Sequence, residues 1–83
     1  MIEAAQIRAA RALLDLSQTD LATLASLSVA SVKRLEAATA IRGTAETVWK
    51  IQKALETAGV EFIPEEGARG LGVRLRKTRN TLL

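Results

Sequence analysis

The sequence predicts a mainly α-helical fold, a small bundle of about four helices followed by a C-terminal β-hairpin. The first observation is that apolar residues recur at three- and four-residue spacing through residues 4–58. The second is a change of pattern after Gly59, where apolar and polar residues begin to alternate as in β-strands. The third is the length, since 83 residues allow one small domain.

The first helix is predicted over residues 4–14. Its core face is expected to consist of Ile7, Ala10, Leu13 and Leu14, which recur at helical spacing. Arg8 and Arg11 interrupt the apolar positions, and Arg8 is expected to be solvated.

Residues 17–37 predict two short helices joined by a tight turn. Ser17 and Asp20 can satisfy free backbone amides at the start of the first helix, and Ser28 can cap the second, from Val29 to about Ala37. The inward positions of this segment are Leu21, Ala22, Ala25, Leu27, Val32 and Leu35. Such short apolar stripes can be buried only against each other and a third helix.

These apolar residues and Gln18, at their spacing in QTDLATLASLSVASVKRLE, resemble the helix-turn-helix of the Xre and lambda-repressor family of bacterial and phage DNA-binding regulators. The resemblance covers about residues 5–58 and implies a lambda-repressor-like bundle that binds double-stranded DNA. Family members usually have Gly in the turn because the backbone there has a positive φ. This chain has Ser26, at a steric cost of about 1 kcal/mol. The alternative interpretation is an ordinary helical hairpin.

The resemblance implies that the second helix of the motif enters the major groove and contacts base edges. By position in the motif, the base-contacting residues are Ser28, Val29, Ala30, Lys33 and Arg34. Arg34 is expected to read guanine N7 and O6 with two hydrogen bonds, whereas Lys33 can contact either a base or a phosphate. Val29 and Ala30 can touch a thymine methyl group.

Two further sets of residues follow from the same resemblance. Gln18, Arg42 and Thr44 are the expected DNA phosphate contacts, and Thr44 can also cap the next helix. Arg11 and Glu36 are expected to form a structural ion pair that clamps the first helix to the third.

A fourth helix is predicted over residues 45–58 and ends at Gly59. Its core face consists of Val48, Ile51, Leu55 and Ala58. Trp49 lies off that stripe. It either shields the edge of the core or anchors a subunit contact, because Trp is enriched among interface hot spots.

The β-hairpin is predicted from residues 60–63 and 71–76, with a polar turn over 64–70. Leu71, Val73 and Leu75 alternate with Arg74 and Arg76 on the opposite face. Because an isolated hairpin is marginally stable, its apolar face must pack on the helices or pair with another copy. The expected dimer interface consists of Trp49, Phe62, Val73 and Leu75, with the strands of two copies joined into one sheet.

The predicted organisation is therefore a DNA-binding domain over residues 1–59, a hairpin extension over 60–76 that dimerises the chain, and a disordered tail over 77–83. Residues 1–67 carry seven basic and nine acidic residues, whereas residues 68–83 carry five basic residues and no acidic ones. This asymmetry favours a polyanion partner, although a basic end that only aids solubility is the alternative.

The composition argues against several function classes. The chain has no Cys and no His, which removes the commonest metal ligands and general base. We therefore expect no metal, no cofactor and no enzymatic activity. No apolar run approaches the roughly 20 residues of a membrane span, and a cytoplasmic protein is expected.

Two functions remain open from the sequence. The first is a transcriptional regulator, a repressor that binds a palindromic operator as a homodimer. The second is an antitoxin-like interaction protein that binds a partner protein through the hairpin and autoregulates its own operon. A third possibility, a fold kept only for protein contact, is disfavoured by Lys33 and Arg34 on the expected groove face.

Overall fold

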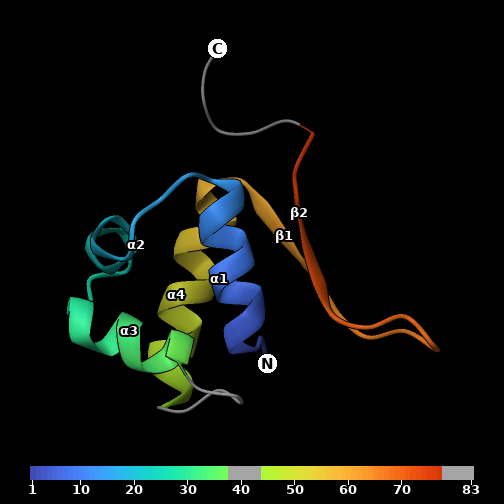
Figure 1. Cartoon of the computed structure of the whole chain (residues 1–83), viewed down its shortest axis with the longest axis horizontal. Coiled ribbons are helices and arrows are strands. Elements are labelled where there is room, and N and C mark those ends of the chain that lie inside the picture. The colour runs from blue at the N-terminus through green and yellow to red at the C-terminus, as the bar shows by residue number, and fades with distance from the viewer. Residues whose placement is uncertain (38–43, 78–83) are drawn as a thin grey trace.

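The computed structural model describes residues 1–37 and 44–77, and in these residues it shows the predicted architecture, helices followed by a two-stranded hairpin (Figure 1). The helices are α1 (Ala4–Leu13), α2 (Gln18–Ala25), α3 (Val29–Ala37) and α4 (Ala45–Ala58). The strands are β1 (Val60–Ile63) and β2 (Gly72–Leu75). α1 and α2 each pack against both α3 and α4, so that no helix has to bury its apolar stripe alone.

One hydrophobic core joins the four helices and the first residue of β1. Its fully buried larger side chains are Ile7, Leu21, Val32, Val48, Ile51, Leu55 and Val60. Ile2 and Ala4 are also buried, ahead of the apolar positions expected in the first helix. The prediction of Leu13 as a core residue is wrong, because its side chain is 43% exposed. It is rotated by about 100° from Leu14, which packs against the core instead.

The predicted caps are present at three helix starts. Ser17 Oγ accepts from the Asp20 N–H at 2.9 Å, and Asp20 Oδ2 accepts from the Ser17 N–H at 3.0 Å. The backbone hydrogen bond from Ser17 lowers the pKa of the Asp20 carboxyl. Ser28 Oγ and Thr44 Oγ1 accept from the backbone three residues on, each at 3.1 Å, at the starts of α3 and α4.

The turn between α2 and α3 has at Ser26 the positive φ that the family resemblance implies for this position. Its φ of 58° and ψ of 46° lie in the left-handed region. This conformation lets the Leu27 N–H donate to the Ala22 carbonyl, five residues back, at 2.9 Å. The turn therefore sets the angle between α2 and α3. It does so with a left-handed backbone that favours glycine, although Ser26 carries a Cβ atom.

Ser26→Gly should raise the free energy of unfolding by up to about 1 kcal/mol, because it removes the Cβ from a left-handed residue. Urea denaturation measures the change. Ser26→Ala is the matched control, since it keeps the Cβ and should leave the stability close to that of the parent chain. Equal shifts for the two variants would contradict the assignment of strain to this turn.

The base of the hairpin is built into the helical body. β1 and β2 pair antiparallel, with Phe62 opposite Val73 and Ile63 opposite Gly72; β2 packs on α1 and β1 on α4. Phe62, Val73 and Leu75 are half-buried against the common core. Of the two arrangements that the sequence leaves open for the apolar face of the hairpin, the structure shows these three side chains packed against the core of their own chain.

A buried glutamine ties the hairpin to α1. Gln6 is 5% exposed, and its Nε2 donates to the Gly72 carbonyl at 3.0 Å and, more weakly, to the Ile63 carbonyl at 3.4 Å. Its Oε1 accepts from the Glu3 N–H at 2.8 Å. The side chain thus serves as a cap for α1 and as an anchor for both strands.

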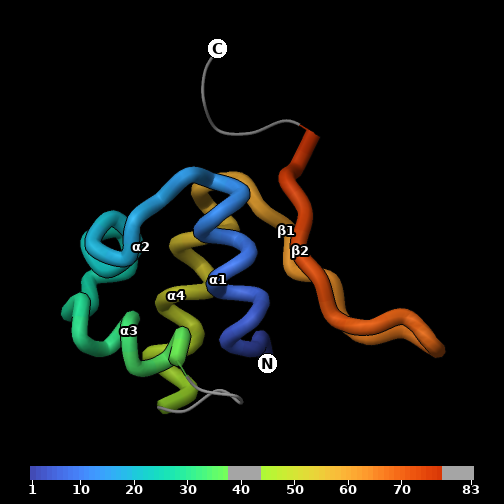
Figure 2. Tube along the Cα trace, viewed as in Figure 1, coloured from blue at the N-terminus to red at the C-terminus, as the bar shows by residue number. Residues whose placement is uncertain are grey.

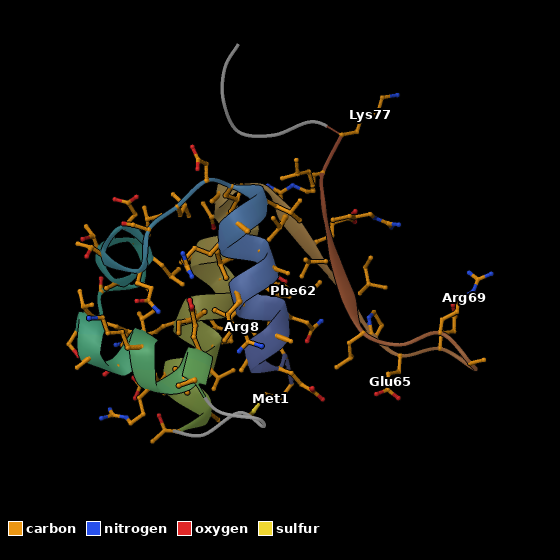
Figure 3. All side chains as sticks on the ribbon, in the orientation of Figure 1. Met1, Arg8, Phe62, Glu65, Arg69 and Lys77 are labelled. Carbon is orange, nitrogen blue, oxygen red and sulfur yellow. The ribbon has the colours of Figure 1, made fainter. Side chains whose placement is uncertain are left out.

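Beyond the Ile63–Gly72 pair, the hairpin continues as an arm, which we define as residues 64–71. Glu66 and Arg69 exchange two backbone hydrogen bonds of 3.0 Å and close the arm with a two-residue turn. Gly67 has a φ of 60° at the first turn position, where a type II′ turn requires glycine. Figure 2 shows this arm standing away from the helices, and Figure 3 places Glu65 and Arg69 on it.

Candidate nucleic-acid interface

The outward face of α3 carries two cations next to a small residue. Val32, Leu35 and Glu36 are buried, which leaves Ala30, Lys33 and Arg34 exposed along one side of the helix. Neither Lys33 nor Arg34 takes part in a salt bridge with another described residue. Both charges are therefore available to an anionic partner.

The two other residues expected to contact bases are less free. Val29 is half-buried and packs against the core. Ser28 is exposed, but its Oγ accepts from the Ser31 N–H and its hydroxyl donates to Ser31 Oγ at 3.0 Å. Part of the hydrogen-bonding capacity of Ser28 thus belongs to the helix cap.

An ion pair holds α3 against α1. Arg11 Nε donates to Glu36 Oε2 and Arg11 Nη2 to Glu36 Oε1, both at 3.0 Å. The Glu36 side chain is 3% exposed and that of Arg11 25%. The hydrogen bond to Glu36 is the main reason that the pKa of Arg11 lies above its ordinary value, so the guanidinium stays charged.

Further contacts converge on Glu36. Arg11 Nη1 reaches the Leu16 carbonyl at 3.1 Å, and Gln18 Nε2 donates to Glu36 Oε1 at 3.2 Å. Arg8 is exposed, as expected, and its Nη1 also donates to the Glu36 carbonyl. One acidic side chain near the end of α3 thereby links α1, α2 and α3 and fixes the direction in which Lys33 and Arg34 point.

The residues expected to contact phosphate occupy different settings. The amide nitrogen of Gln18 is bound to Glu36, so its amide oxygen and the backbone at the start of α2 remain for other partners. Thr44 is exposed and caps α4, with its Oγ1 also 2.9 Å from Thr47 Oγ1. Arg42 lies outside the residues that the structure describes.

The basic residues of the hairpin form no common face with α3. Figure 1 shows α1 between α3 and the strands. Arg74 is paired with Glu61, its partner across the strands, at 2.8 Å. The excess of positive charge in the C-terminal sequence is thus partly neutralised where the hairpin is anchored.

The part of the chain that the structure describes has no group of three or more Asp or Glu side chains placed to hold a metal ion. None of the described helices combines the length and the apolar character that crossing a membrane would require.

Sequence reasoning missed Gln6, Ile2 and the contact of Arg8 with α3. Only Gln6 had a local signal, since it stands three residues after Glu3 in the arrangement of a capping box. Its second role as the anchor of the strands depends on residues more than 50 positions away and has no counterpart in the local pattern.

Comparison with known proteins agrees with this geometry. A family model described as Helix-turn-helix matches residues 7–62, which include α1 from Ile7 on, the other three helices and β1 up to Phe62. No curated protein matches the chain.

Proposed function

The chain belongs to the Xre and lambda-repressor-like helix-turn-helix family, whose members regulate transcription by binding DNA, and from this premise we propose that it is a repressor that occupies a palindromic operator as a homodimer. The observation that carries the proposal is the exposed pair Lys33 and Arg34 on a helix held in place by the buried Glu36. A rigidly oriented helix is what base reading requires, since hydrogen bonds to base edges depend on direction.

In the proposed complex, α3 enters the major groove. Arg34 forms two hydrogen bonds with a guanine, and Lys33 contacts a neighbouring base or phosphate. Ala30 and Val29 approach a thymine methyl group, and Ser28 contributes the lone pair that its cap leaves free. Exposure supports Ala30, Lys33 and Arg34 most strongly, since Val29 is half-buried.

Phosphate contacts are proposed on both sides of α3. Gln18 at the start of α2 and Thr44 at the start of α4 stand at helix N-termini, where backbone amides favour an anion. Arg42 is the proposed basic contact just before Thr44. These contacts set the position of the protein on the duplex and carry no sequence information.

Dimerisation is proposed because two recognition helices must meet half-sites about one helical turn, roughly 34 Å, apart. Residues 1–59 would supply the DNA contacts and the hairpin over residues 60–76 the assembly. Trp49 is 59% exposed and free to meet a second copy. Phe62, Val73 and Leu75 pack on their own core and would act by holding the hairpin in place. Such a repressor would work in the cytoplasm.

Arg34→Ala should cost about 1 to 3 kcal/mol of affinity for the selected operator and relax the preference at one base pair of each half-site. Binding to a panel of operators with single changes, by fluorescence anisotropy, measures both effects. Arg74→Ala is the matched control: it removes the same charge from the hairpin, where Arg74 is paired with Glu61. Uniform weakening on every sequence would make Arg34 a phosphate contact instead.

A second function, the antitoxin-like one, is favoured by one observation, the exposed arm that stands away from the body (Figure 2). A neighbouring gene product that arrests growth would then be neutralised by this chain. Replacing residues 64–71 by Asn-Gly removes the arm and should therefore abolish that protection. The dipeptide closes the hairpin directly after Ile63 and before Gly72, so the two strands stay joined. Protection by the shortened chain would exclude the arm as the binding element.

A further inference from the structure

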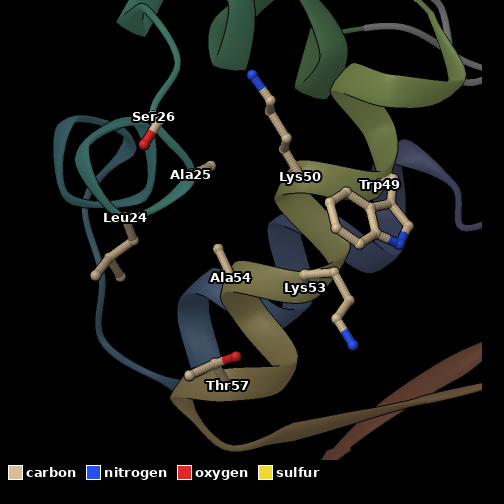
Figure 4. A pocket seen from close by; sticks show the side chains of 8 residues that line it. All are labelled: Leu24, Ala25, Ser26, Trp49, Lys50, Lys53, Ala54 and Thr57. Atoms are coloured by element: carbon tan, nitrogen blue, oxygen red, sulfur yellow. The ribbon is translucent and has the colours of Figure 1, made fainter.

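The outer side of α4 carries an apolar groove that the bundle does not fill. Figure 4 shows it between the end of α2 and α4, and its volume is about 350 Å³. The apolar wall consists of Leu24, Ala25, Trp49 and Ala54. Leu24 is 53% and Trp49 59% exposed. Two large apolar side chains left in water beside one groove indicate a surface that a partner covers.

Two cations border this groove. Lys50 and Lys53 lie one turn apart on α4 and both line it. Lys53 approaches Glu56 at 3.9 Å, a long and exposed contact that holds the ammonium group only weakly. A segment that combines apolar and acidic side chains would therefore match the groove in both polarity and charge.

The arm combines these side chains. It carries two acidic residues, Glu65 and Glu66, against one basic residue, Arg69, and all three are exposed near its tip. Neither carboxylate forms a salt bridge with another described residue. Pro64, just after β1, and Leu71, just before β2, supply apolar surface at the start and the end of the arm. The arm is also held rigidly at its base, because Gln6 binds the carbonyls of the last strand pair. A two-stranded ribbon without a covering layer is only marginally stable in water, and a partner that packs on the free end of the arm would stabilise it.

We propose that the arm of one copy lies in the α4 groove of a second copy, and that the second copy returns the same contact. Glu65 and Glu66 then face Lys50 and Lys53 of the other protomer, and Pro64 and Leu71 cover Trp49. Such an exchange is a two-fold, self-complementary contact in which each copy contributes the same two surfaces. The inference rests on the dimer of the proposed function and names the surfaces that form it.

The reciprocal contact covers large exposed apolar side chains that lie on the helices. Leu24 belongs to α2 and Trp49 to α4, whereas joined strand edges would pair backbone groups of β1 or β2. In the exchanged arrangement, the most exposed aromatic residue becomes the centre of the interface, where Trp side chains contribute most to binding. The acidic and basic groups surround it and make the association salt-dependent.

Charge reversal tests the proposal. One variant carries Lys50→Glu with Lys53→Glu, and a second carries Glu65→Lys with Glu66→Lys. Each alone should weaken dimerisation about a hundredfold or more, because like charges then meet at both contacts. An equimolar mixture should restore association to within about tenfold of the parent chain, since each contact in the mixed dimer again joins opposite charges. Sedimentation velocity measures assembly, and circular dichroism verifies that each variant is folded.

The single Trp of the chain supplies a second readout. Diluting the parent chain through its dissociation constant should move the Trp49 emission to longer wavelength as the groove opens to water. Dimers of either variant alone would overturn the proposal in favour of joined strand edges. A mixture that stays monomeric, or a parent chain that is monomeric at all concentrations, would overturn it as well.

Failure of the inference and failure of the proposed function are distinguishable. If the chain selects no sequence from a random DNA pool but the mixture of variants associates, the arm exchange stands and the repressor role falls. If a specific operator is selected but reversal leaves the dimer intact, the repressor role stands and the exchange falls.

Discussion

Arg11→Ala should lower the free energy of unfolding by about 3 to 5 kcal/mol, because it leaves the Glu36 carboxylate buried without its cation. The side chain of Glu36 is 3% exposed, and Gln18 alone would then satisfy one of its oxygens. Thermal unfolding followed by circular dichroism measures the loss. For a domain of this size, it should appear as a fall in melting temperature of well over 10 °C.

Arg8→Ala is the matched control for this variant. It removes the same charge from the same helix, but Arg8 is exposed and makes one hydrogen bond to the Glu36 carbonyl. Its loss should cost about 1 kcal/mol. Adding Glu36→Gln to Arg11→Ala should recover part of the stability, since the uncharged amide is cheaper to bury. Equal melting temperatures for Arg8→Ala and Arg11→Ala would show that the ion pair does not stabilise the fold.

Ending the chain at Gly59 should abolish cooperative folding. Val60 is fully buried, and burying such a side chain contributes about 1.5 to 3 kcal/mol. The cut also removes the hydrogen bond from Gln6 to the Gly72 carbonyl, which contributes about 0.5 to 1.5 kcal/mol. Together with the lost cover from Phe62, Val73 and Leu75, this approaches the whole stability of a small domain.

Two chains serve as controls for the truncation. One ends at Lys77 and keeps the complete hairpin, so it should melt like the parent chain. The other has residues 64–71 replaced by Asn-Gly and keeps the base of the hairpin while losing the arm. It should also fold, but as a monomer whose affinity for a palindromic operator is lower by orders of magnitude. A chain ending at Gly59 that still unfolds cooperatively near the parent temperature would show that the strands are not part of the core.

These experiments separate two parts of the hairpin that differ in their surroundings. The base is covered by α1 and α4 and anchored by Gln6, so changes in it affect folding. The arm touches water on most sides, so changes in it should spare the fold and, in the proposed dimer, should weaken association. Treating residues 60–76 as a single extension would hide this difference.

Local chemistry made much of the fold predictable. Ser17, Ser28 and Thr44 cap their helices, and Gly59 ends α4. Each of these features depends on residues within one or two turns of the chain, and so each leaves a signature in the sequence. The exposed position of Lys33 and Arg34 follows equally from the helical spacing of Val32 and Leu35.

By itself, the sequence determined the order of the elements, their caps and the exposed side of α3, because periodicity and capping are interactions between near neighbours. Only the tertiary structure decided that Leu13 is exposed and that Glu36 binds Arg8 and Gln18 in addition to the expected Arg11. Tertiary structure alone likewise placed the base of the hairpin in the core while its arm projects. These outcomes depend on which surfaces meet across 18 to 66 residues of chain, and the free energy of such contacts comes from desolvation and shape that a local pattern does not encode.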